Sequence, residues 1–273
     1  MFTFAVTLPY AGSIRVHELT NREIFNIIKY CSIEDVEGLN SLFETAVFSK
    51  LPPLNLIDKF YLLLYYRSLY FGSVLQIKIK HEKAKHMDVF IDNMLEKIQS
   101  LSMVENHIEE YNNCKIELSV PYKLFFNSME DIVFDCIKSI TFDSASYDLT
   151  TLSSKEKDEI LKYLPTNFTN KVFNYFHYIG NTLKDLPMID NYPEYEVEGV
   201  NISVISNDPL KFIMAMFNQD MVNFLSFMYH YVNKVGGTME DFFNLTFNDA
   251  KIILDFYKEE VIKQQESLNN NKK

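Results

Sequence analysis

The chain has 273 residues, which is enough to bury a sizeable core in one large domain or two smaller ones. Hydrophobic residues make up 47% of it and aromatic residues 15%, with only 7 glycines, and this composition favours packed helices over disorder. The formal net charge is -11 and the basic residues are scattered, so we expect no direct nucleic-acid partner, because phosphate binding depends on clustered positive charge.

The cysteines and the hydropathy of the chain indicate the cellular compartment in which we expect the protein. Cys31, Cys114 and Cys136 are odd in number and form no CxxC pair, which fits a reduced, cytosolic setting. The opening MFTFAVTLPY alternates like a strand and lacks the basic start of a signal peptide. No stretch reaches the roughly 18 apolar residues that a spanning helix needs, so direct membrane insertion is not expected.

The N-terminal third predicts a hairpin followed by helices. Turn residues between two alternating segments predict a hairpin over residues 2–19. Thr20 and Glu23 form a capping box that begins a helix. Ser32 can cap a second helix that ends near Phe48.

Residues 58–73, DKFYLLLYYRSLYFGS, predict an unusually apolar helix. Apolar positions surround the whole helix instead of forming one stripe, which indicates that it is buried or covered by a partner. Gly72 is the expected C-cap. Arg67 is the one arginine of this apolar segment and calls for an explanation.

Strands and helices alternate beyond this point. Residues 73–80 and 114–120 read as strands that join one small antiparallel sheet, whereas the spacing of apolar residues over 85–101 predicts a helix. Further strand alternation follows in 137–142, and Ser153 with Glu156 makes a second capping box.

Two long helices close the chain, over 208–234 and about 246–265, before a disordered tail at 266–273. We expect an α+β fold that is predominantly helical, with an N-terminal β-hairpin and a small antiparallel sheet. A soft boundary separates an N-terminal region, 1–110, from a mixed region, 111–265, and the two should pack as one unit.

No common catalytic or phosphate-binding motif is present: the chain has no GxSxG, Walker loop, GxGxxG or HExxH. We therefore name no catalytic residue, metal ligand or cofactor-binding residue, and we predict that the protein is not an enzyme. An enzyme whose site these motifs do not describe stays open as another class.

The 208–234 helix is a candidate binding surface, because its apolar residues exceed a single stripe. Phe217, Phe224 and Met228 are the side chains that we expect to face a partner. Core packing is the alternative explanation for the same residues.

The order of the N-terminal motifs resembles a known family. FAVTLPYAGSIRVHELTNREIF is followed by DKFYLLLYYRSLYFGS, then by VLQIKI and by the cysteine-bearing CKIELSV. This order resembles the baseplate hub assembly proteins of T-even-type contractile-tailed bacteriophages, as does the C-terminal NLTFNDAKIILDFYKEE. The positions that match the family pattern are Leu8, Pro9, Gly12, Leu19, Thr20, Asp58, Tyr61, Arg67 and Gly72.

This resemblance implies a non-enzymatic morphogenesis protein that assists assembly of the central hub of a contractile-tail baseplate. The alternative role is a permanent structural subunit of the hub in the virion. Baseplate hub proteins are the implied partners, and self-association into a homo-oligomer stays open. The implied location is the host cell cytoplasm during phage assembly or the virion baseplate.

Asp58, Tyr61 and Arg67 are the candidate structural or partner-binding residues within the matched helix. A buried Arg67 needs carboxylate or carbonyl acceptors for its five N–H donors. Asp58 would lie about 13 Å away along the axis and on the opposite side of the helix, so we do not expect the two to pair. The acceptors should belong to another element of the chain, as a structural anchor, or to a partner protein.

Overall fold

The chain folds into two compact units, which we describe separately. The terminal unit comprises Met1–Val6, Arg15–Lys50 and Phe217–Lys273, and the central unit comprises Thr7–Ile14 and Leu51–Met216. The computed structural model describes residues 3–79, 86–100, 107–111, 113–126, 128–143, 145–184, 195–197, 200–201, 209–218 and 221–270.

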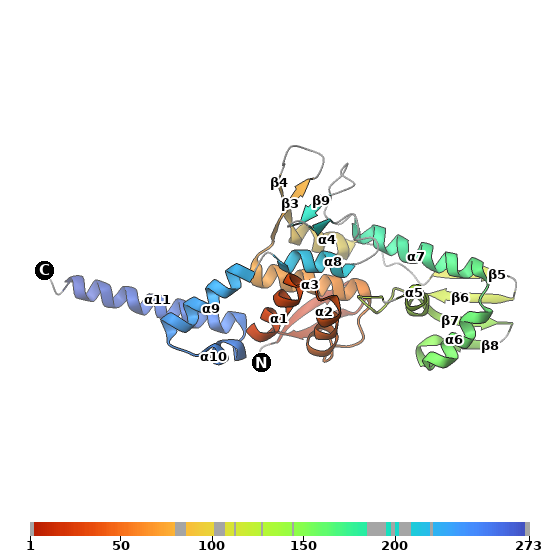
Figure 1. Cartoon of the computed structure of the whole chain (residues 1–273), viewed down its shortest axis with the longest axis horizontal. Helices are drawn as coiled ribbons and strands as arrows, with labels where there is room; N and C mark the ends of the chain where they lie inside the picture. Colours follow the sequence, from red (N-terminus) through yellow and green to blue (C-terminus); the bar gives the residue numbers. More distant parts are fainter. Residues whose placement is uncertain are drawn as a thin grey trace. The chain divides into compact units, whose positions relative to one another are not determined.

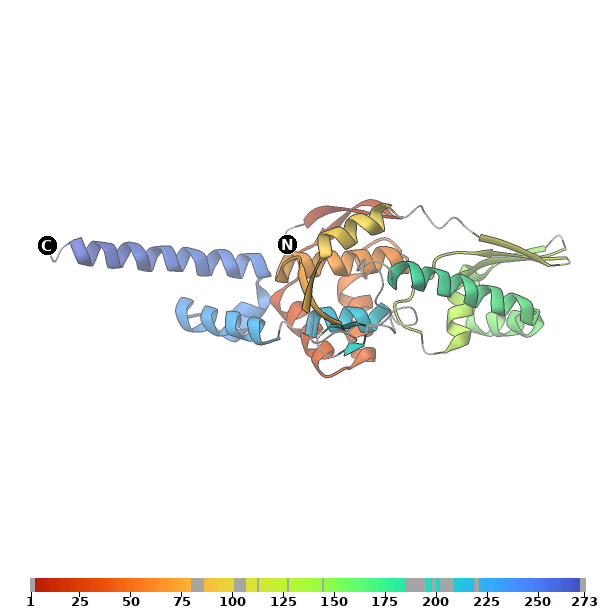
Figure 2. The ribbon, with the colours of Figure 1, turned by 90° about the horizontal axis from the view of Figure 1, so that it is seen from above.

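Helices make up most of the terminal unit. Figure 1 labels them: α1 (Asn21–Ser32), α2 (Val36–Leu42), α9 (Met221–Val235), α10 (Met239–Asn244) and α11 (Phe247–Asn270), with a π-helical turn at Phe43–Val47 after α2. As Figure 2 shows, α9 and α11 run side by side.

Local capping signals explain where α1 and α2 begin, but the cap of α2 is not the predicted one. Thr20 and Glu23 form the predicted capping box at α1. The second helix does not start at Ser32, because α1 continues through that residue. Its cap is Asp35, whose carboxylate accepts from the Gly38 N–H at 2.8 Å, so the prediction of a Ser32 cap was wrong.

An aromatic cluster forms the core of the terminal unit. Phe242 of α10 is fully buried, and the rings of Phe224, Phe227 and Tyr231 from α9 lie 5.7, 5.5 and 5.4 Å from its centroid. Such tilted and edge-on ring pairs stabilise a core beyond the area that they bury. The cluster therefore fixes which face of α9 points inward.

The N-terminal hairpin has the predicted form. Its strands are β1 (Thr3–Leu8) and β2 (Gly12–His17), paired in a two-stranded sheet. Gly12 has a φ of 69°, a left-handed conformation that glycine adopts without strain, and this explains the glycine after the turn.

In the central unit the helices are α3 (Leu56–Phe71), α4 (Ile91–Ser100), α5 (Met129–Cys136), α6 (Ser154–Tyr163), α7 (Thr166–Lys184) and α8 (Pro209–Asn218), the last of which runs into the terminal unit. A single 3-10 turn covers Leu149–Thr151. The strands are β3 (Val74–Ile79), β4 (His86–Phe90), β5 (His107–Tyr111), β6 (Cys114–Leu118), β7 (Ile137–Phe142), β8 (Ala145–Asp148), β9 (Tyr195–Val197) and β10 (Val200–Asn201).

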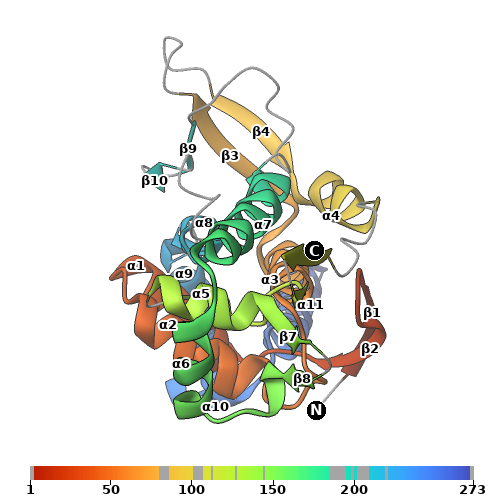
Figure 3. The same cartoon turned by 90° about the vertical axis from the view of Figure 1, so that its right-hand side faces the viewer.

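These strands form two sheets, not one. The first has the order β10-β9-β3-β4 (Figure 3) and the second the order β5-β6-β7-β8 (Figure 1), and all their pairs are antiparallel. The prediction that the strands at 73–80 and 114–120 join one sheet was therefore wrong, since β3 pairs with β4 and β6 with its sequence neighbours. Short connections favour such pairing of consecutive strands.

A second correction concerns residues 85–101. Residues 86–90 form strand β4, and the helix begins only at Ile91. Val89 is buried while Asp88 and Phe90 are exposed, which is the alternation of a strand. Over residues 86–90 the spacing of apolar residues is compatible with a helix and with a strand. These residues form a strand because they pair with β3.

Helix α3 is buried around most of its circumference, as predicted, but one side carries the half-buried Tyr61 and Tyr65 and the exposed Leu69. Its buried residues include Leu56, Phe60, Leu63, Tyr66 and Tyr70. The helix ends at the predicted Gly72, which has a φ of 89° and donates its N–H to the Ser68 carbonyl.

The observed fold confirms the predicted class, α+β and predominantly helical with a hairpin and small antiparallel sheets. The region predicted as one helix over 208–234 contains α8 and α9, and Asp208 and residues 219–220 lie outside the described part. Helix α11 continues past the predicted end at 265 to Asn270. Among the described residues, no helix combines the length and apolarity that crossing a membrane requires.

Candidate interaction surface

Asp58 holds the turn of the N-terminal hairpin. The main-chain N–H groups of Tyr10 and Ala11 donate to its two carboxylate oxygens, each over 2.9 Å. The side chain is 1% exposed, and all three residues belong to the central unit. Burial raises the pKa of the Asp58 carboxyl, and the two hydrogen bonds oppose that rise. This geometry is that of a structural anchor.

Arg67 donates to main-chain carbonyls of the chain itself. Its Nε–H donates to the Met216 carbonyl at 3.0 Å, and Nη1 donates to the Gly72 carbonyl at 2.9 Å. Both carbonyls lie at C-terminal ends of helices, α8 and α3, where carbonyls lack intrahelical partners and a cation is favoured. The guanidinium also lies 5.4 Å from the ring centroid of Phe71. For these two donors, the acceptors are in the chain and not in a partner.

The other predicted residues occupy less exposed positions than expected. Tyr61 on α3 and Met228 on α9 are half-buried. Phe217 is 2% exposed and Phe224 is 1% exposed, so the expectation that these two face a partner was wrong. Phe224 lies in the cluster around Phe242. Some of the apolar residues that exceed a single stripe on this segment are therefore part of the core.

A different set of apolar side chains on α9 is exposed. Val222, Leu225 and Tyr229 are 77%, 39% and 64% exposed. Their spacing of three and four residues places them on one side of the helix, away from the buried Phe224 and Tyr231. We call these three residues the α9 stripe.

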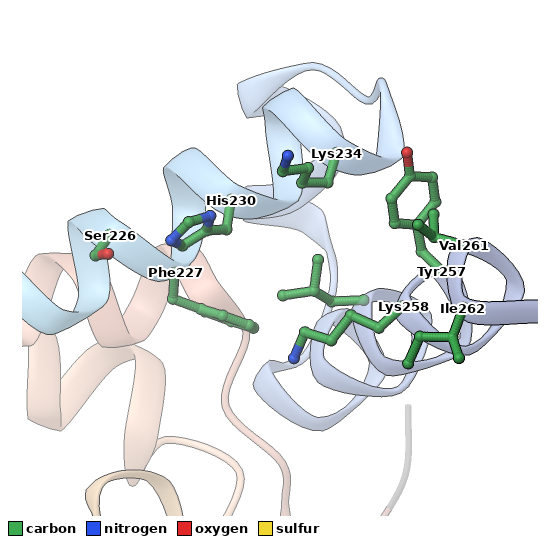
Figure 4. Close-up of a pocket in the computed structure, with 9 residues that line it drawn as sticks. Ser226, Phe227, His230, Lys234, Tyr257, Lys258, Val261 and Ile262 are labelled. Atoms are coloured by element: carbon green, nitrogen blue, oxygen red, sulfur yellow. The ribbon is translucent and has the colours of Figure 1, made fainter. Parts of the chain in front are cut away.

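A groove lies between α9 and α11, with a volume of about 720 Å³. Figure 4 shows its walls: Phe227, His230 and Lys234 project from α9. From α11, the groove is lined by Leu254, Tyr257, Lys258, Val261 and Ile262, and Ser226 of α9 completes the lining. We call this feature the α9–α11 groove.

The charged residues of the groove are all basic. Lys234 and Lys258 line it together with His230, and no carboxylate is among the lining residues. Lys258 forms an ion pair with Asp255 over 2.9 Å, and both side chains are more than half exposed. Exposed ion pairs of this kind contribute little free energy, so Lys258 can exchange Asp255 for another carboxylate at low cost.

Sequence reasoning missed α11 as part of this surface. The signal was present, because apolar residues occur on more than one side of the helix. Ile252 and Phe256 are 66% and 64% exposed, although Leu254 is buried between them in the sequence. The same excess of apolar residues over a single stripe predicted a binding surface on the 208–234 helix, but it was not used for the last helix.

Comparison with known proteins identifies a family. The model of the family described as T4 bacteriophage base plate protein matches residues 1–184. No curated protein and no solved structure matches the chain significantly. The match covers the hairpin, α3 and its anchors Asp58 and Arg67, whereas the α9 stripe and the α9–α11 groove lie beyond it. Because the family model matches well over half of the sequence, the chain belongs to the T4 bacteriophage base plate protein family.

Proposed function

We propose that this baseplate protein is an assembly factor for the central hub, acting by binding hub subunits and not by covalent catalysis. Its place of action is then the cytoplasm of the infected host cell. Support comes from the family membership and from the order of N-terminal motifs, which resembles that of hub assembly proteins.

One observation carries the proposal: the exposed apolar surface of the terminal unit, made of the α9 stripe and the α9–α11 groove. Exposed apolar side chains gathered on a helix face or in a groove are typical of protein-binding sites. Burying a side chain such as Leu225 or Val222 contributes about 1.5 to 3 kcal/mol when the residue is fully covered. A hub subunit that covers this surface would gain binding free energy of that kind.

Hub assembly factor and permanent hub subunit differ in one measurable respect, namely whether the protein remains in the finished particle. An affinity tag on the chain allows baseplate precursors to be isolated from infected cells. Quantitative mass spectrometry of these precursors and of purified virions then gives the copy number of the protein in each.

We expect the tagged chain to copurify with hub proteins from precursors and to be absent from purified virions. Stoichiometric copies in virions would contradict a transient factor and favour the permanent subunit. Absence from both samples would contradict a role in the baseplate hub altogether.

A further inference from the structure

We propose that the α9–α11 groove binds an amphipathic helix that carries acidic residues beside its apolar face and is contributed by another baseplate protein. This inference rests on the proposed function, since it specifies the kind of segment that the partner presents. The groove lies within residues 226–262, outside the matched residues 1–184, so the family assignment does not describe it.

The shape of the groove favours a helix as its occupant. Both walls are helices, and the residues that line each wall recur every three or four positions, as with Phe227, His230 and Lys234 on α9. A third helix can pack its ridge of side chains between two such rows. An extended peptide would find no free strand edge here, whereas a helix satisfies its own backbone hydrogen bonds.

The apolar side chains that line the groove require apolar anchor residues on the bound helix. Leu254, which lines the groove, is 6% exposed, and the lining residues Phe227 and Val261 are half-buried. A volume of about 720 Å³ accommodates several large side chains. Anchors at positions i, i+3, i+4 and i+7 of a partner helix would meet these lining residues together.

The basic residues that line the groove favour a partner helix with acidic residues beside its apolar face. Lys234, Lys258 and His230 line the groove, in a chain whose net charge is -11. Among the described residues, Lys234 has no ion-pair partner of its own, and Lys258 has only the exposed pair with Asp255.

Basic lining is not a general property of hollows on this protein. A second hollow, beside α6 in the central unit, is lined by Glu156 and Glu159 and by no basic residue. The two hollows therefore favour opposite charges, and of these two the α9–α11 groove is the one that fits an acidic amphipathic helix.

Binding can be tested with synthetic peptides as probes. Overlapping peptides, each long enough for about four helical turns, would cover the baseplate proteins of the same phage. Fluorescence anisotropy against the full-length chain gives a Kd for each peptide. We expect the binding peptides to be amphipathic and acidic, and to bind more weakly when salt shortens the Debye length from about 10 to 3 Å.

Two matched pairs of variants locate the site. Lys258→Glu should weaken binding of the selected peptide about tenfold, whereas Lys263→Glu should leave the Kd within about twofold. Both lysines are exposed on α11 and form i,i+3 ion pairs, but Lys263 does not line the groove. In the same way, Ile262→Asp should abolish binding while Ile252→Asp, on an exposed position outside the lining, should not.

Each outcome decides something. Equal effects of the members of a pair, a preference for basic peptides, or no binding by any peptide would overturn the groove assignment. If peptides fail while the tagged chain still copurifies with hub proteins, the proposed function stands and only this inference fails. Circular dichroism melts of the four variants confirm that each one remains folded.

Discussion

The Nε–H of Arg67 donates to the Met216 carbonyl over 3.0 Å, which ties the middle of α3 to the end of α8. Arg67 is 3% exposed, and its bond to Met216 is buried where water cannot replace it, whereas the bond to the exposed Gly72 is partly buried. A guanidinium in the centre of an apolar helix is therefore explained by two helix ends whose carbonyls need donors.

Replacing Arg67 with Met keeps an apolar stem of similar length but leaves the carbonyls of Met216 and Gly72 without these donors. A buried polar group without a partner costs about 1 to 3 kcal/mol, so the Met216 carbonyl alone should lower the free energy of unfolding by about that amount. Arg22→Met is the matched control, because Arg22 is half-exposed, contacts Glu240 and lies 5.4 Å from the Phe243 ring.

Chemical denaturation followed by circular dichroism measures both variants. The control should lose less than about 1 kcal/mol, as expected for an exposed ion pair. Equal losses for the two variants would contradict the anchoring role of Arg67.

Asp58→Asn tests the clamp on the hairpin turn. An amide offers one acceptor oxygen instead of two, so either Tyr10 or Ala11 loses its hydrogen bond, and we expect destabilisation of about 1 to 3 kcal/mol at neutral pH. Burial raises the pKa of Asp58 in the folded state, so its protonation favours folding at low pH, and this contribution is lost as the pH rises through the folded pKa.

The deficit of Asp58→Asn relative to the natural chain should therefore be larger near about pH 4 than near about pH 7. Asp255→Asn should show the opposite trend, because the hydrogen bond from Lys258 lowers the pKa of Asp255. Denaturation curves across this pH range give both deficits. A loss of stability for Asp58→Asn that grows with pH would contradict the raised pKa of Asp58 in the folded state.

Asn21 fastens the start of α1 to the segment that joins α10 and α11. Its Nδ2 donates to the carbonyls of Phe242 and Thr246 at 3.0 and 3.3 Å, and the residue is fully buried. Asn21→Ala should lower the free energy of unfolding by about 1 to 3 kcal/mol. Asn233→Ala removes a comparable bond to the Tyr229 carbonyl at an exposed site and should change it by less than about 0.5 kcal/mol, measured in the same denaturation experiment.

The sequence predicts well those features of the fold that depend on local signals. The capping box of Thr20 and Glu23 and the C-cap at Gly72 each depend on residues a few positions apart. Strand pairing involves a second segment, and the pattern within one strand does not show that β3 pairs with β4 and β9 or that β6 pairs with β5 and β7. For the same reason the alternating residues at 86–90 were read as helix.

The candidate surface could be predicted only in part. The apolar surplus on the 208–234 segment led to the prediction of a binding surface there, but Phe217 and Phe224, which were expected to be exposed, are buried. Which face of α9 points inward depends on Phe242, a residue of another helix that no periodicity within α9 reveals. The groove requires α9 and α11 together, and so its lining could not be read from either helix alone.

We propose that this baseplate protein works through the exposed apolar surface of its terminal unit. The most direct test is complementation of a phage that lacks the protein, with baseplate formation counted by electron microscopy of lysates. The chain with Leu225→Asp and Tyr229→Asp, two exposed positions of the α9 stripe, should stay folded but fail to restore baseplates, whereas the unchanged chain restores them. Full restoration of baseplates by the folded double variant would contradict the claim.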